Sequence, residues 1–166
     1  MVKRIIYLCF TLLVLAGCSY SVYSNAYPHL KKIRVMAFEN KTSEFDLADK
    51  ALEILSAQFN SDGRLKLVTQ QPDCQLDGSI TDYKESVYSY DAANNVQDYQ
   101  IRITFSVALV DLVKNQTIYE NNNLVITEQY AVSALSSSKF RSKEEALNEI
   151  IRNLFKAIVQ NSLENW

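Results

Sequence analysis

The chain has 166 residues, of which 48% are hydrophobic and 22% are charged, a composition that fits one globular domain and excludes a largely disordered protein. The net charge of −2 shows no basic excess of the kind that nucleic-acid-binding proteins usually carry. One histidine and three cysteines leave few side chains for a metal cluster or a Cys/His catalytic pair. We therefore expect no nucleic-acid partner, no metal site and no bound cofactor.

The first eighteen residues have the pattern of an export and lipidation signal. Lys3 and Arg4 precede an apolar run, Ile5 to Ala16, which is shorter than the ~20 residues that span a bilayer. The run ends in Leu15-Ala16-Gly17-Cys18, which matches the bacterial lipobox, where the cysteine thiol is acylated and the preceding peptide is removed. We predict a signal peptide at 1–17 and a covalent lipid, including palmitate, on Cys18. An ordinary signal peptide with a chance cysteine is the alternative.

Removal of the first 17 residues leaves a mature chain with 15 basic and 19 acidic side chains, a net charge of −4. Residues 18–30 are polar and Tyr-rich, and we interpret them as a lipidated tether in which His29 is a solvated linker residue. Residues 31–166 then form a single domain. Cys74 has no partner for an internal disulfide, and its place at the start of an alternating segment predicts burial.

The domain is expected to have the order β-α-β-β-β-β-α. Residues 99–109 alternate strictly between apolar and polar, and helix two begins with a capping box of Ser142 and Glu145. A shift of the apolar set after Asp82 predicts a β-bulge, Ser43 is the expected N-cap of the first helix, and Gly63 its C-cap. The expected elements are strands at 33–38, 65–68, 74–90, 96–113 and 117–127, and helices at 44–60 and 143–162.

Consecutive strands late in the chain favour antiparallel pairing. We therefore predict an α+β fold, with two helices on one face of a four- to five-stranded, mixed and mostly antiparallel sheet. The turn between the first strand and the first helix is expected at residues 39–42.

No catalytic motif stands out in the sequence. Gly-rich phosphate loops, the zinc-protease pattern H-E-x-x-H and C-x-x-C are all missing. Ser136 and Lys139 have the spacing of a Ser-x-x-Lys nucleophile, but they lie in a Ser-rich stretch without the partner motifs, which indicates a chance match. We expect that the protein is not an enzyme.

Four stretches resemble the LptE family, the outer-membrane lipoproteins of the lipopolysaccharide-assembly machine. Their order, spacing and connection to a lipobox make the set more specific than any one of them. The stretches are Cys18–Tyr23, Pro28–Ile33 with Phe38–Thr42, Asp62–Val68, and Leu76–Tyr83.

The resemblance implies a domain that plugs LptD, a large β-barrel, and helps it to place lipopolysaccharide in the outer leaflet. It also implies a lipid anchor in the outer membrane of a Gram-negative bacterium, with the domain facing the periplasm and the barrel lumen. Basic residues near one end of the sheet would bind lipopolysaccharide. In this chain the hairpin from Tyr83 to Arg102 offers only Lys84 and Arg102, alongside three acidic residues.

The long strands also suggest a partner surface. The hairpin is expected to extend past the helices, and its outer part carries Tyr83, Tyr88, Tyr90 and Tyr99. Tyrosine is favoured at protein interfaces, so we predict that these four side chains contact the barrel. The alternative is that they simply decorate a solvated sheet, where aromatic residues are also favoured.

Two other functions fit part of the sequence. CsgG-like secretion subunits and lipoprotein activators of cell-wall synthases also have a strand followed by a helix, with a segment like Phe38-Glu39-Asn40 between them. The long strands and the Asp62–Leu65 link favour LptE over these. A lipid-anchored enzyme is the third possibility, and the missing catalytic motifs argue against it.

Overall fold

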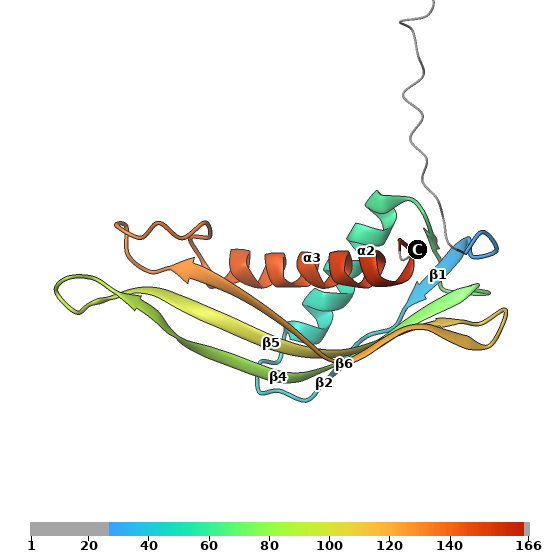
Figure 1. Cartoon of the computed structure of the whole chain (residues 1–166), viewed down its shortest axis with the longest axis horizontal. Coiled ribbons are helices and arrows are strands. Elements are labelled where there is room, and N and C mark those ends of the chain that lie inside the picture. Colours follow the sequence, from blue (N-terminus) through green and yellow to red (C-terminus); the bar gives the residue numbers. More distant parts are fainter. Residues whose placement is uncertain (1–26, 165–166) are drawn as a thin grey trace, which may run out of the picture.

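The computed structural model describes residues 27–164. Its two layers are a long twisted sheet and a pair of helices that both lie on one face of that sheet (Figure 1). The elements are β1 (Lys32–Val35), β2 (Glu39–Asn40), α2 (Leu47–Asp62), β3 (Lys66–Leu67), β4 (Cys74–Tyr90), β5 (Val96–Asp111), β6 (Gln116–Ala131) and α3 (Lys143–Ser162). The predicted α+β class, with two helices on one face, is confirmed.

The strand order in the sheet is β3-β1-β4-β5-β6, and β2 also pairs with β4. Pairs among β1, β2, β3 and β4 are parallel, whereas β4, β5 and β6 form a long antiparallel meander. The three long strands have 16 or 17 residues each, so the meander is the longest feature of the molecule. It positions the two ends of the sheet far apart.

The first helix begins later than the sequence predicted. Its N-cap is Asp46 rather than Ser43, because Asn40 holds the preceding segment in a turn. The Asn40 amide donates to the carbonyl oxygen of Glu44 at 2.7 Å, and its Oδ1 accepts from the backbone N–H of Thr42 at 3.0 Å. Gly63 ends the helix with φ of 73°, as predicted for a left-handed C-cap.

Other boundaries also moved by a few residues. The segment 39–40, predicted as a turn, pairs with β4 as β2, which brings the sheet to six strands. Strand β6 runs four residues beyond the predicted end, because it stays paired with β5 as far as Ala131. Ser142 caps the second helix as predicted, because its Oγ accepts from Glu145 N–H at 3.1 Å; the Glu145 carboxylate reaches back one residue further than in a regular capping box and accepts from Arg141 N–H at 2.7 Å.

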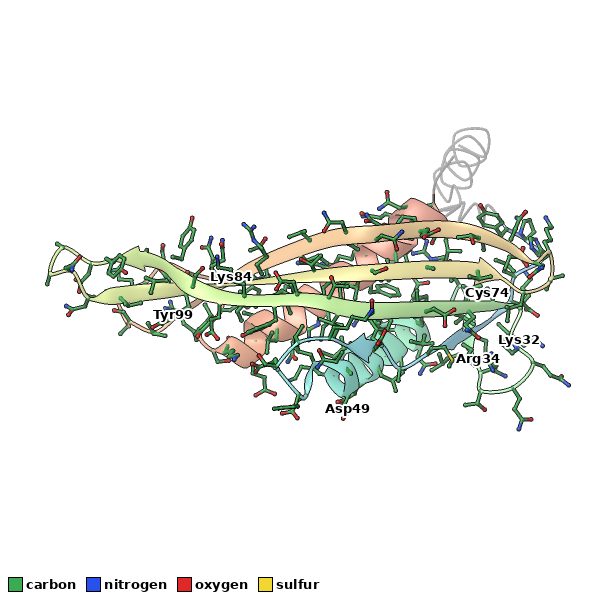
Figure 2. The ribbon with its side chains drawn as sticks, turned by 90° about the horizontal axis from the view of Figure 1, so that it is seen from below. Lys32, Arg34, Asp49, Cys74, Lys84 and Tyr99 are labelled. Carbon is green, nitrogen blue, oxygen red and sulfur yellow. The ribbon has the colours of Figure 1, made fainter. Side chains whose placement is uncertain are left out.

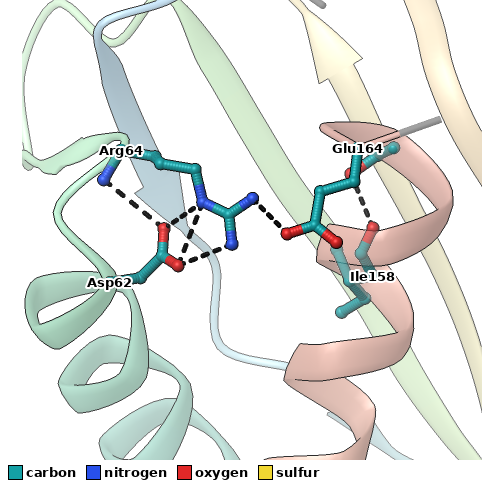
Figure 3. Close-up of polar contacts among 5 residues, drawn as sticks. Asp62, Arg64, Ile158 and Glu164 are labelled. Atoms are coloured by element: carbon teal, nitrogen blue, oxygen red, sulfur yellow. Dashed lines mark hydrogen bonds and ion pairs between the residues drawn. The ribbon is translucent and has the colours of Figure 1, made fainter. Parts of the chain in front are cut away.

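One hydrophobic core lies between the helices and the sheet. The two helices meet through an edge-to-face pair of Phe59 and Phe155, whose ring centroids are 4.9 Å apart. At their C-terminal ends, Arg64 joins Asp62 and Glu164 through ion pairs of 2.7 and 2.5 Å (Figure 3). Cys74 is fully buried and has no disulfide, as predicted. Its burial raises the pKa of the thiol to about 12.

The folded domain includes residues that were predicted to lie in the tether. Leu30 is fully buried in the core. His29 is not a solvated linker residue: its Nε2 lies 2.6 Å from Oδ2 of the fully buried Asp111. Asp111 lies 82 residues away in sequence, at the end of β5, so this pair fastens the start of the domain to the meander.

Candidate functional site

The outer half of the β4–β5 hairpin, from the level of the α3 N-terminus to the tip that extends past it, is the candidate site (Figure 1). A β-bulge in β4 between Ile80 and Asp82 sets its side-chain directions. After this bulge, Tyr83 pairs with the buried Ile103 and therefore faces the helices. Lys84 pairs with Arg102 on the opposite, outer face. The predicted bulge is thus confirmed, and it separates the predicted site residues between two faces.

On the helix side, Glu85 is the centre of a polar cluster. Tyr83 Oη donates to its carboxylate at 3.0 Å, and Tyr130 Oη of β6 donates to it as well. Lys143 Nζ, at the start of α3, lies 3.2 Å from Glu85 and 3.0 Å from Glu44. The same ammonium group lies 5.3 Å from the centroid of the Tyr83 ring. This cluster joins β4, β6, α3 and the loop before α2.

The electrostatics of this cluster favour its charged form. Burial alone would raise the pKa of Glu85, but hydrogen bonds from Tyr130, Tyr83 and Lys143 outweigh it and lower the pKa. The Lys143 pKa is raised, since hydrogen bonds to Tyr83, Glu44 and Glu85 outweigh its burial. Burial, followed by the hydrogen bond to Glu85, also raises the pKa of Tyr130. All three groups therefore keep their ordinary charges at neutral pH, which suits a structural tie.

The four predicted tyrosines divide into two pairs. Tyr83 and Tyr99 are half-buried, and Tyr99 stacks on Tyr130 with ring centroids 5.8 Å apart. Tyr88 and Tyr90 are 54% and 55% exposed, at positions where the β4–β5 register shifts near the hairpin tip. Only Tyr88 and Tyr90 thus present most of their surface to a partner.

Lys84 and Arg102 are both exposed and lie directly opposite each other on adjacent strands (Figure 2 labels Lys84 at this end). Like charges in this arrangement repel each other. Among the described residues, no ion pair joins either side chain to a carboxylate within 4.0 Å. The structure thus brings the two predicted lipopolysaccharide-binding residues together.

A buried carboxylate that no sequence motif indicated, Asp98, lies beneath the hairpin tip. Asp98 is 7% exposed; its carboxylate accepts a hydrogen bond from Ser89 Oγ at 2.5 Å and another from Ser136 Oγ. Burial alone would raise the Asp98 pKa, but the serine hydrogen bonds outweigh it and lower the pKa. The loop between β6 and α3 is thereby fastened onto the hairpin. The only sequence signal was the Ser-rich stretch at 133–138, which predicts a loop but no partner.

A surface hollow also lies between the N-terminal ends of the two helices. This concavity of about 380 Å³ is lined mainly by charged side chains that pair with one another, Lys50 with Glu144 and Lys143 with Glu44. Residues 27–164 contain no cluster of three metal-ligating side chains. No helix in this range is long and apolar enough to cross a membrane.

Sequence comparison decides the family. The LptE profile, described as lipopolysaccharide-assembly, matches residues 30–162. The chain belongs to the LptE family. This match spans both helices and all six strands, so it covers the second half of the domain as well as the stretches that carried the resemblance.

Solved structures match the chain at low sequence identity, and the first of those below, with a TM-score above 0.5, shares its fold. CT253 from Chlamydia trachomatis is 15% identical, with a TM-score of 0.53 over 78% of this chain and 94% of that chain. Lipoprotein GNA1162 from Neisseria meningitidis is 12% identical, with a TM-score of 0.47 over 78% of this chain and 99% of that one. Rare lipoprotein B from Shewanella oneidensis is 15% identical, with a TM-score of 0.45 over 76% and 91%. No curated protein matches the chain in sequence.

Family membership and the lipobox together define the coarse function. The protein is a bacterial envelope lipoprotein of lipopolysaccharide assembly, in a family whose role is non-enzymatic. Cys18, where the lipid is predicted, lies outside the described residues. Its lipidation therefore stays a prediction, as do the roles of the four tyrosines, Lys84 and Arg102.

Proposed function

We propose that this LptE-family lipoprotein binds the LptD β-barrel, plugs its lumen and helps it to assemble lipopolysaccharide in the outer leaflet of the outer membrane. Lipid on Cys18 would hold the protein at that membrane, with the domain facing the periplasm and the lumen. The single observation that carries the proposal is the hairpin end that extends past the helices and exposes Tyr88 and Tyr90 (Figure 1).

The outer face of the sheet supports the same partner. On the central strand β5, the residues that face away from the helices include Gln100, Arg102, Thr104 and Ser106, whereas the alternate residues are buried. The interiors of large outer-membrane barrels are polar and wet. A polar sheet face with an aromatic tip suits insertion into such a lumen, where the tip would contact the wall.

The tyrosines give the sharpest test. A photo-crosslinking amino acid at Tyr88 or Tyr90 should capture LptD in living cells, because a tyrosine at an interface buries a large area at low entropy cost. The control position is Gln160, which is exposed on α3 and faces away from the core. Capture from position 160 but not from 88 or 90 would mean that the helices, and not the hairpin, meet the barrel.

We place direct lipopolysaccharide contact at Lys84 and Arg102. Two unneutralised cations on facing strands would be relieved by an anion, and lipopolysaccharide carries phosphate groups that both side chains bind well. The double variant Lys84→Ala, Arg102→Ala should retain less lipopolysaccharide in a pull-down, with unchanged thermal stability. Lys156→Ala, an exposed lysine on α3, is the matched control. Equal retention by both variants would refute this site while leaving the barrel partnership intact.

A further inference from the structure

The other end of the sheet, where the described domain begins, has its own surface chemistry. Lys31, Lys66 and Lys114 are exposed there, and Lys32 is partly exposed. Lys32 and Lys66 are register partners on β1 and β3, and Lys114 lies in the turn after β5. Figure 2 shows this end, marked by Lys32 and Cys74, opposite the end that carries Lys84 and Tyr99. Four basic side chains therefore gather at one end of a net acidic domain.

Nearby carboxylates are occupied within the fold. Asp73 Oδ2 accepts from the backbone N–H groups of Lys31 and Lys32 at 2.9 Å each, and its other oxygen lies 3.9 Å from Lys32 Nζ. Asp111 is fully buried, where it pairs with His29 and accepts from two backbone N–H groups of the β5–β6 turn. Asp62 and Glu164, on the neighbouring helix ends, both pair with Arg64. The exposed lysines thus face solvent largely uncompensated.

Two apolar side chains lie beside these lysines. Leu112 and Val113, in the same turn as Lys114, are 41% and 63% exposed. The turn is held at this end of the sheet, because Leu112 N–H donates to the carbonyl oxygen of Asp73 at 2.9 Å. An exposed apolar pair with basic neighbours is the pattern of a segment that lies at a membrane surface.

The predicted lipid attachment lies close along the chain. Eight residues, 19–26, separate Cys18 from Tyr27, the first described residue, so they reach at most ~30 Å. The whole meander is longer than this, since a strand of 16 residues extends ~50 Å. Of the two ends of the sheet, a lipid on Cys18 therefore keeps the lysine-bearing end nearer to the bilayer.

We propose that this end of the sheet, formed by Lys31, Lys66, Leu112, Val113 and Lys114, docks on an anionic phospholipid surface. The inference rests on lipidation of Cys18 and concerns the lipoprotein before it binds any partner. Each lysine near an anionic bilayer strengthens attachment about fivefold, and the apolar pair enters the headgroup layer. The lipid anchors the protein, while this surface fixes its orientation and points the tyrosine-bearing hairpin tip away from the bilayer.

The test uses the mature lipoprotein in phosphatidylcholine vesicles with and without phosphatidylglycerol, after mass spectrometry has verified the lipid. A fluorophore is attached at Val113→Cys or, as the control, at Tyr88→Cys near the far end of β4. Native Cys74 does not compete for the label, because it is fully buried and its pKa is raised to about 12. Quenching by lipids that carry a nitroxide in the upper acyl chain reports contact with the bilayer.

We expect several-fold stronger quenching at position 113 than at 88 in vesicles that contain phosphatidylglycerol. Lys31→Glu with Lys66→Glu should lower it to the level at position 88, whereas Lys41→Glu with Lys156→Glu, which reverses two lysines elsewhere, should leave it unchanged. Equal quenching at the two positions in the verified lipoprotein would overturn the proposal. Quenching at position 113 that neither double charge reversal changes would overturn it as well. Neither result bears on the barrel partnership, which is measured separately by crosslinking.

Discussion

Gly78 lies directly against the ring of Phe38, and adding one methyl group there tests how the segment between β1 and β2 packs on the meander. A Cβ built at Gly78 would lie 2.5 to 2.8 Å from three atoms of that ring, well inside ordinary van der Waals contact. Phe38 is 3% exposed and packed in the core, so the ring has little room to move. We expect Gly78→Ala to destabilise the protein by about 1–3 kcal/mol, the usual cost of overpacking.

The clash has a clear genetic test, because it requires the ring. Gly78 has no left-handed backbone angle, so once the ring is gone alanine should be neutral or stabilise by up to about 1 kcal/mol through the unfolded state. Phe38→Ala by itself should cost about 3–5 kcal/mol. Urea unfolding of the parent, both single variants and the double variant completes the cycle.

Gly63→Ala serves as the matched control. That position has φ of 73° and open space around the added Cβ, so its cost arises from backbone strain and should be the same with or without Phe38. If Gly78→Ala costs as much in the Phe38→Ala background as in the parent, the ring does not lie against the glycine and the reasoning fails.

Four further variants test the core, the buried carboxylate and the lipid. Phe105 and Leu154 are 1% and 0% exposed, so replacing either with alanine should lower the free energy of unfolding by about 2–5 kcal/mol, more for Phe105. Urea midpoints that do not change would contradict their burial. Folding lowers the Asp98 pKa, so the ionised carboxylate stabilises the fold above its unfolded pKa of about 4, and this stabilisation is lost as the pH falls further. Asp98→Asn should therefore reduce the loss of unfolding free energy between neutral and acid pH. An unchanged loss would mean that other groups cause the acid sensitivity. Cys18→Ala should leave an uncleaved or mislocalised precursor in membrane fractions, whereas a normally processed parent without a lipid mass would refute lipidation.

Features that depend on near neighbours in sequence were predictable. Strict alternation over 99–109 predicted the central strand, and the shift of the apolar set after Asp82 predicted the bulge that the β4–β5 register contains. Ser142 with Glu145, and Gly63, predicted helix ends from one turn of chain. In each case the determining side chain and the backbone group that it affects are a few residues apart.

Features that depend on distant partners were not predictable. The sequence around His29 predicts a linker residue, because its partner Asp111 lies 82 residues away along the chain. Asp98 has the sequence pattern of an ordinary polar strand residue, because its partner Ser136 lies 38 residues away, in the loop between β6 and α3.

The sequence by itself determined the number, order and kind of the long elements, because their hydrophobic periodicities are written in consecutive residues. It also supplied the six candidate side chains of the hairpin. Only the tertiary structure decided which of these are available: the pleat beyond the bulge turns Tyr83 toward Glu85 and Lys143 and leaves Lys84 outside, opposite Arg102. A side chain's partners depend on sheet register and helix placement, and these are set by the packing of the whole core rather than by any one segment.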